Sequence, residues 1–260
     1  MKKTLIALAV VASAAVSGSA MAAWTTSGTG GTFTMSGELT PKDKVTPWEV
    51  KVYNGATSLN AEIVKNKNTV DIAVQNYIPV LGIRNHDKNG FLGSVGRTAI
   101  PQIDFKGKLK VDTFSAGKAQ IELKVTDPSG ATELGTLTAP LSTAALTAWN
   151  NGWSSVAAPN DTMAFWGGVS ADLLTAMAKV TAKSFLTNLD PEILEKWEFQ
   201  VDTGPSVKDE GFYNGNDIYK VAYGAGFEPG AKLSITLNTA PASDTAIQWK
   251  AELPIEVSYR

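Results

Sequence analysis

The sequence predicts a mainly β fold, either a sandwich or a barrel, and three observations support this. Apolar and polar residues alternate along many segments, as they do in strands that place one face on a core. Turn signals such as Asn54-Gly55 and Glu228-Pro229-Gly230 separate these segments. The 260 residues are 43% hydrophobic and only 18% charged, which suits a chain with a sizeable core rather than a disordered one.

The first 22 residues have the features of a secretory signal peptide. Lys2 and Lys3 precede an apolar run from Leu5 to Val16, and Ala20-Met21-Ala22 has the small-x-small pattern of a cleavage site. The apolar run is too short to span a bilayer comfortably, which disfavours an uncleaved anchor. We therefore expect cleavage after Ala22 and export to the periplasm.

Residues 23–41 form an N-terminal extension in front of a domain that spans 42–260. The segment from Thr25 to Gly31 contains only Thr, Ser and Gly, so it cannot pack a core by itself. Apolar residues and one glycine then alternate with polar residues, at Phe33, Met35, Gly37 and Leu39. We predict a short amphipathic strand on a flexible leash. Gly37 either fits a shallow part of a partner surface or marks a bend.

Further alternating segments follow along the chain, at 48–52, 70–74, 109–111, 121–125 and 233–237. The longest alternation runs from Ile247 near the C-terminal end, and its later apolar positions are Trp249, Ala251, Leu253, Ile255, Val257 and Tyr259. We predict one long strand there, with a ladder bond missing at Pro254, which has no N–H.

One region, about 143–211, has helix signals and is predicted to be a small helical subdomain inserted in the sandwich. Ser170 is a good N-cap, and Leu173, Met177 and Val180 follow at helical spacing. Asp190-Pro191-Glu192 has the pattern of a second helix start, with a cap, a proline at the first position and an acid next. That second helix would run to about Trp197.

The two ends of the chain resemble those of chaperone–usher pilins. The resemblance rests on the run from Gly30 to Leu39 and on the alternating last strand with Tyr259 as its penultimate residue. It is strongest with the FaeG-type fimbrial major subunits, which are also adhesins. The segments 48–52, 100–105 and 132–137 and the absence of Cys carry this part of the likeness.

The resemblance implies an incomplete immunoglobulin-like β-sandwich that lacks its last strand. A periplasmic fimbrial chaperone would fill the resulting groove, and an outer-membrane usher would direct assembly. The N-terminal extension of a neighbouring copy would then replace the chaperone, which is donor-strand exchange. Phe33, Met35 and Leu39 would enter groove pockets, Gly37 would fit where the groove is shallow, and the apolar face of 249–259 would line the groove and contact the chaperone.

The resemblance also implies that the fimbrium, or pilus, adheres to host glycoconjugates as a lectin and contributes to virulence. Four of the seven Trp lie within 143–211. The polar stretch with Trp149, Asn150 and Trp153 is the candidate receptor site, because sugar sites combine an aromatic ring with polar groups on loops. Trp166 and Trp197 are expected to be structural. The alternative is a minor or purely structural subunit without receptor binding.

Other function classes are disfavoured by composition. A net charge of −2 argues against nucleic-acid binding, and the absence of Cys with a single His excludes disulfides, thiol catalysis and Cys/His metal sites. We expect no metal and no cofactor, and no enzymatic activity. His86 is interpreted as a solvated turn residue, and Asp190 and Glu192 as helix-capping residues rather than a catalytic pair.

Two further alternatives were an outer-membrane barrel and a periplasmic glycan-acting enzyme. The helical region and Arg260 after the final aromatic argue against the first, and the lack of a convincing catalytic set argues against the second.

Overall fold

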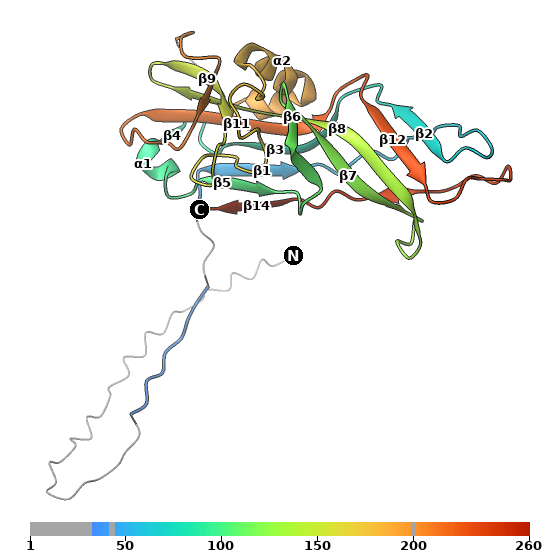
Figure 1. Cartoon of the computed structure of the whole chain (residues 1–260). Coiled ribbons are helices and arrows are strands. Elements are labelled where there is room, and N and C mark those ends of the chain that lie inside the picture. The colour runs from blue at the N-terminus through green and yellow to red at the C-terminus, as the bar shows by residue number, and fades with distance from the viewer. Residues whose placement is uncertain (1–32, 42–44, 199–200) are drawn as a thin grey trace, which may run out of the picture. The chain divides into compact units, whose positions relative to one another are not determined.

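The computed structural model describes residues 33–41, 45–198 and 201–260 (Figure 1). The predicted signal peptide and residues 23–32 of the extension lie outside these ranges. The chain divides into two compact units, 1–43 and 44–260, each of which is described by itself. In the first unit, residues 33–41 form neither helix nor strand.

The second unit is mainly β, which confirms the predicted fold class. Its strands are β1 (Trp48–Val52), β2 (Thr69–Ala73), β3 (Ile78–Asn85), β4 (Phe91–Leu92), β5 (Pro101–Asp104), β6 (Leu109–Ser115), β7 (Lys118–Thr126), β8 (Glu133–Trp149), β9 (Gly152–Ala157), β10 (Val207–Asp209), β11 (Ile218–Phe227), β12 (Lys232–Leu237), β13 (Lys250–Ala251) and β14 (Glu256–Tyr259). The helices are α1 (Gly93–Gly96), α2 (Lys179–Leu189) and the 3-10 helix η1 (Pro191–Leu194).

The long strand β8 organises the large sheet, in which β1, β3, β11, β8, β12 and β2 follow one another. Along one edge of β8, β7 pairs with residues 133–142 and β9 pairs with residues 146–149. Along the other edge, β12 pairs with residues 135–138 and β11 pairs with residues 142–148. Pro140 lies between Thr138, the last residue that pairs with β12, and Ser142, the first that pairs with β11. A proline is tolerated inside this central strand because its missing N–H falls where the partner changes.

The sheet has a core on each face. In β8, Ala145 belongs to the main core with Ile103 of β5 and Tyr223 of β11. The preceding residue Ala144 belongs to a second core with Leu186 of α2. Figure 1 shows α2 on one side of the sheet and β5 with β14 on the other. Because both faces are covered, residues 141–148 are buried without alternation.

The helical insertion is shorter than predicted. Residues 143–149 complete β8, and β9 follows, so the helical part lies between β9 and β10. α2 begins at Lys179 after Ala178, and Ser170 instead accepts a hydrogen bond from Asp172 N in an isolated turn. The second start is confirmed, since Asp190 accepts a hydrogen bond from Glu192 N, but it produces η1, which ends at Leu194.

Two glycines of β11 let the insertion approach the sheet. A Cβ on Gly224 would lie 2.6 Å from Leu186 Cδ2, and one on Gly226 would lie 2.4 Å from Leu189 Cδ1. Carbon atoms at these distances would overlap, so a side chain at either position would force α2 or its side chains to shift in a closely packed interior. The Gly224-Ala225-Gly226 sequence therefore fixes where α2 docks.

Candidate functional site

The C-terminal segment crosses from one sheet to the other. β13 pairs with Val125 and Thr126 of β7, and β14 pairs with residues 101–104 of β5. The prediction of one continuous strand is wrong, since residues 252–255 around Pro254 belong to neither ladder. The alternation persists across this break, and its apolar residues pack on the main core: Trp249, Ala251, Leu253, Ile255, Val257 and Tyr259.

This row of six side chains, which we call the C-terminal stripe, is only half-buried. Each of its members is partly buried, and each residue between them is exposed. In the large sheet, Leu233 and Ile235 of β12 are 3% exposed. The stripe is therefore an apolar core face that this chain covers incompletely.

Strand β1 shows the same incomplete cover. Trp48, Val50 and Val52 share one face, because alternate residues of a strand point the same way. Trp48 is buried and donates a hydrogen bond from Nε1 to the Ala99 carbonyl at 2.6 Å, but Val50 is 40% and Val52 55% exposed. Among the described residues β1 pairs only with β3, and β14 only with β5. Strand edges of this kind accept a further strand.

The N-terminal segment offers apolar side chains. Phe33, Met35 and Leu39 are 86%, 83% and 95% exposed, and a Cβ on Gly37 would have no atom within 4 Å. The apolar side chains of the alternating pattern predicted from the sequence are therefore exposed in the described segment 33–41.

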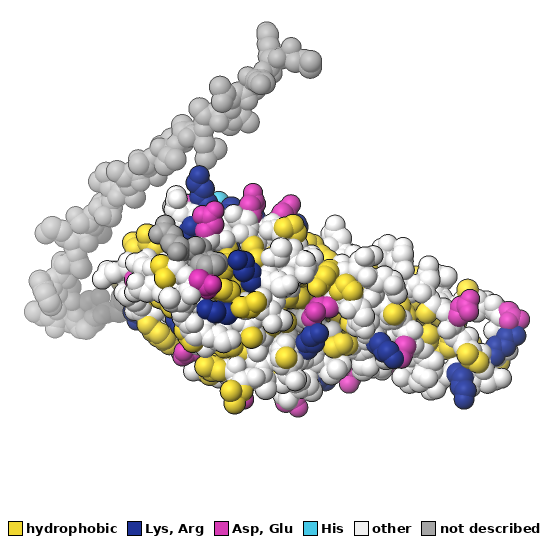
Figure 2. Space-filling view, turned by 90° about the horizontal axis from the view of Figure 1, so that it is seen from above, with side chains coloured by type: hydrophobic (Ala, Val, Ile, Leu, Met, Phe, Trp, Pro, Cys, Tyr) yellow, Lys and Arg dark blue, Asp and Glu magenta, His cyan; other side chains and the backbone are white. Residues whose placement is uncertain are grey.

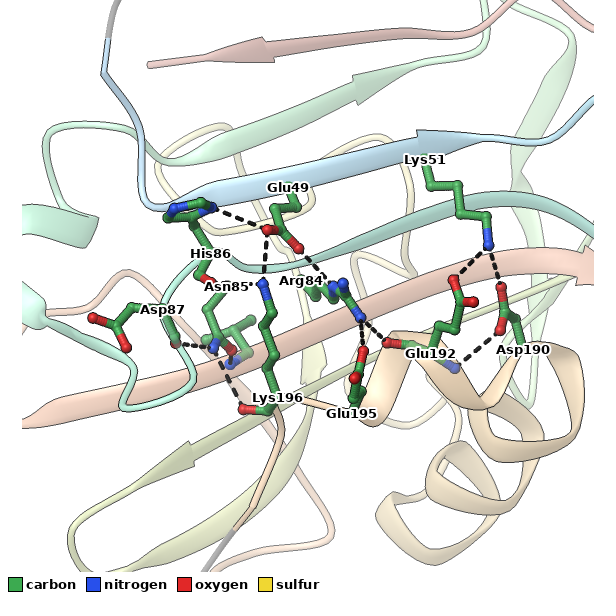
Figure 3. Close-up of polar contacts among 11 residues, drawn as sticks. Glu49, Lys51, Arg84, Asn85, His86, Asp87, Asp190, Glu192, Glu195 and Lys196 are labelled. Carbon is green, nitrogen blue, oxygen red and sulfur yellow. Dashed lines mark hydrogen bonds and ion pairs between the residues drawn. The ribbon is translucent and has the colours of Figure 1, made fainter.

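The opposite face of β1 is polar and contacts the insertion (Figure 3). Glu49 accepts hydrogen bonds from Lys196 Nζ and Arg84 Nε, both at 2.7 Å, and from His86 Nδ1 at 3.0 Å when that nitrogen carries the proton. The hydrogen bond from Lys196 is the largest cause that lowers the pKa of Glu49 to about 2, against the opposing effect of burial.

Lys51 and Tyr53 extend this contact along β1. Lys51 Nζ binds Asp190 at 2.9 Å and Glu192 at 2.8 Å, and the Tyr53 hydroxyl donates to Asp190. Burial opposes ionisation of Asp190, but the bonds from Tyr53 and Lys51 bring its pKa below the ordinary value. A half-open cavity of about 220 Å³ lies between β1, β3 and η1, lined among others by Lys51, Tyr53 and Arg84. Because its charged groups are paired with one another, the arrangement suits holding elements together better than catalysis.

The candidate receptor residues lie around the β8–β9 turn but differ in exposure. Trp149 ends β8 and is half-buried, with Lys208 Nζ 4.6 Å from the ring centroid. Asn150 is exposed, and its side-chain Nδ2 donates a hydrogen bond to Asp217 Oδ1 at 3.1 Å.

Trp153 is a correction to the prediction. Its side chain is 3% exposed, it packs edge-on against Trp197 at 5.4 Å, and its Nε1 donates to Asp202. It therefore offers no ring face to a sugar.

The two Trp expected to be structural also differ. Trp197 is buried, as expected, but Trp166 is 45% exposed. The adjacent Phe165 takes the core position instead, with a left-handed backbone at φ 65° followed by Gly167 at φ 81°. The two glycines after Phe165 and Trp166 favour a tight turn, and in such a turn only one of two neighbouring rings can point into the core.

The comparisons with known proteins decide the family. The model of the family described as fimbrial, major and minor subunit matches residues 1–260. The chain belongs to this family. It is 31% identical to the F41 fimbrial protein and 29% identical to the K88 fimbrial protein AB, both of Escherichia coli, and each comparison covers the whole of both chains. The K88 fimbrial protein AC is 27% identical over the same coverage. The predicted family is thereby confirmed.

The relatives are structural fimbrial subunits of surface appendages, and membership of this K88 and F41 type of family supports self-association of the chain in a fibre. In the part of the chain that the structure describes, no three acidic or His residues gather in a way that could hold a metal ion. Within the same ranges, no helix is both long and apolar enough to cross a membrane. Figure 2 shows acidic and basic side chains interspersed on the face seen from above.

Proposed function

We propose that this fimbrial subunit is a major subunit that polymerises by donor-strand exchange and mediates adhesion to host-cell glycans. The observation that supports assembly most directly is the half-buried C-terminal stripe beside strands with free edges. Such a surface is an aggregation hazard unless another strand covers it.

The N-terminal segment has the complementary pattern. Phe33, Met35 and Leu39 share one face of an extended strand, so they would enter the apolar surface together while the backbone pairs with the edges of β1 and β14. At about 1.5–3 kcal/mol for each fully buried large side chain, the three contribute about 5–9 kcal/mol before backbone hydrogen bonds. Gly37 would lie over a shallow point of that surface.

The same surface requires protection before assembly. A periplasmic chaperone would cover it after export by the signal peptide at 1–22, and an outer-membrane usher would bring the next copy into position. The chaperone would contact the C-terminal stripe, since this is the apolar face that the free chain leaves half-open.

The test is fibre formation with the cognate chaperone and usher. We compare the full chain, a variant without residues 23–41, Gly37→Trp, and Ser36→Trp as a matched control on the polar face of the same strand. We expect no fibres from the truncated chain and from Gly37→Trp, with chaperone complexes intact, and normal fibres from Ser36→Trp. Normal fibres from Gly37→Trp would contradict the shallow-site argument, and fibres from the truncated chain would contradict donor-strand exchange.

For adhesion, Trp149 and Asn150 remain the candidate residues, because Trp149 has an aromatic ring at a turn that also presents an exposed amide. We compare fibres of Trp149→Ala with fibres of Trp166→Ala, which removes an exposed ring elsewhere, on a glycan array and on host cells. Loss of binding by Trp149→Ala alone, at equal fibre yield, is the expected result. Glycan and cell binding retained by Trp149→Ala fibres would show that Trp149 is not part of a receptor site.

A minor or purely structural subunit is the second candidate, since the matching family includes both major and minor subunits. The number of copies per fibre, measured by quantitative mass spectrometry, separates the two. A few copies per fibre would favour the minor role, and many copies without glycan binding would favour a purely structural one.

A further inference from the structure

We propose that residues 190–196 of the insertion position β1 as an acceptor strand, by holding it in place before a donor strand arrives. The inference rests on the proposed donor-strand exchange and concerns the same strand edge. We call the side chains of Glu49, Lys51, Tyr53, Asp190, Glu192 and Lys196 the β1 brace.

Strand β1 needs such support because it has one strand neighbour among the described residues. Its five residues pair with β3 from Trp48↔Asn85 to Val52↔Leu81. The inner face becomes more exposed along the strand, from Trp48 at 7% to Val52 at 55%. An edge strand with a half-exposed apolar face is expected to open locally more easily than the core strands.

The outer face supplies the missing contacts. Glu49, Lys51 and Tyr53 alternate along the chain and therefore point the same way. Each binds a residue of 190–196: Glu49 binds Lys196, and both Lys51 and Tyr53 bind Asp190. Two outward positions of β1, and Tyr53 directly after the strand, are thus joined to a single short segment.

That segment is itself fixed to the sheet. Ile193 is 4% exposed and lies against two glycines, with its side-chain carbons 3.2 Å from a Cβ placed on Gly82 or on Gly224. One carboxylate serves two purposes, since Asp190 Oδ1 accepts from Glu192 N to start η1 while Oδ2 accepts from Lys51. The partner of β1 is therefore a capped turn docked on the core.

The contacts also cross from β1 to β3. Arg84, which is paired with Glu49 in the β1–β3 register, binds Glu49 at 2.7 Å and Glu195 at 2.8 Å. Lys196 Nζ binds both Glu49 and the His86 carbonyl at 2.7 Å. An isolated surface ion pair contributes little, but several that share partners and hold the same two strands act together. The result is a β1 edge already placed for a donor, which lowers the ordering cost of strand addition.

The test uses the exported chain, alone and after addition of a synthetic peptide of residues 25–41. The double variant Lys51→Met with Tyr53→Phe removes the contacts of Lys51 and Tyr53 within the β1 brace and keeps side chains of similar volume. The control Lys124→Met removes the exposed Lys124–Glu133 pair at 2.7 Å between β7 and β8. Hydrogen–deuterium exchange of the 48–53 amides and the rate of peptide uptake are measured for each.

We expect the double variant alone to exchange the 48–53 amides about tenfold faster than wild type, with β7 and β8 unchanged. The double variant is expected to take up the peptide more slowly than wild type. Once the peptide is bound, we expect the two proteins to exchange the 48–53 amides at the same rate. The control is expected to match wild type in both measurements.

Three results would overturn the positioning role: wild-type exchange at 48–53 in the double variant, an increase shared by β7 and β8, or unchanged peptide uptake. Failure of the wild-type chain to bind the peptide is a different result. It would overturn the proposed assembly mechanism, and the positioning of an acceptor strand with it.

Discussion

The two faces of the large sheet differ in how completely this chain covers them. On the α2 face, small residues of β8 and β11 receive large side chains of the insertion, and Leu186, Phe185 and Leu189 are 5% exposed or less. On the opposite face, large apolar side chains of β1 and the C-terminal stripe remain half-exposed. One core is complete within a single chain, and the other is open along an edge.

This difference separates the folding of the subunit from its assembly. A face closed by the chain's own helix gains its full stability from one molecule. Under the proposed donor-strand exchange, a face left open at strand edges gains further stability when a donor strand arrives, and that gain would join copies. The following predictions test this separation.

The largest effect is expected on the closed face. Leu186→Ala removes a fully buried side chain beneath α2 and should lower the free energy of unfolding by about 2–5 kcal/mol. Because the proposed donor would bind on the opposite face, the loss should be the same for the chain alone and for the chain with bound 25–41 peptide. Denaturant unfolding of both states measures it, and a loss that changes on peptide binding would contradict the separation.

A smaller effect that depends on the donor is expected on the open face. Leu253→Ala should cost about 1 kcal/mol in the chain alone, because the side chain is only half-buried, and about 2–3 kcal/mol after peptide binding. The same unfolding experiment measures both values. Ser258→Ala, on the exposed face of β14, serves as the control and should change neither.

The smallest effect concerns the polar contact behind β1 and depends on pH. The pKa of Glu49 lies near 2 in the folded chain, below its ordinary value of 4.5, so ionised Glu49 stabilises the fold above about pH 4.5. That contribution should be lost progressively as the pH falls from about 4.5 to about 2. Glu49→Gln should therefore be less stable than wild type by about 1–2 kcal/mol at pH 7, after allowance for solvent screening, and nearly equal to it at pH 2.

Thermal unfolding of both proteins between pH 2 and pH 7 measures this dependence. A stability difference that stays constant over that range would show that the charge of Glu49 is not what stabilises the contact.

Local patterns in the sequence predicted the parts of the fold that depend on neighbouring residues. The alternation at 249–259 identified a one-faced segment correctly, and Asp190-Pro191-Glu192 identified a helix start, because capping is a matter of a few adjacent atoms. Pro254 predicts a missing ladder bond, but the sequence does not show that the segment changes sheets there.

One error arose where burial from both sides removes the alternation, and two others concern single Trp side chains. Residues 143–149 were predicted to be part of a helical insertion, because a strand covered on both faces has no polar side to reveal its period. Trp153 was predicted to lie in an exposed polar loop, whereas the contact with Trp197 from the distant insertion buries it. Trp166 is expected from the sequence to be structural, whereas it is 45% exposed and its neighbour Phe165 takes the core position.

The class of fold, the family, the alternating pattern at both ends of the chain and the absence of cysteine chemistry follow from the amino-acid sequence. Periodicity, composition and local capping are properties of short segments, and they survive without knowledge of the partners. The tertiary structure alone decided which strand edges stay open, which aromatic rings reach the surface, and that residues 190–196 contact β1. The contact of Lys51 with Asp190 joins positions 139 residues apart, and that of Trp153 with Trp197 joins separate elements, so a local pattern does not record them.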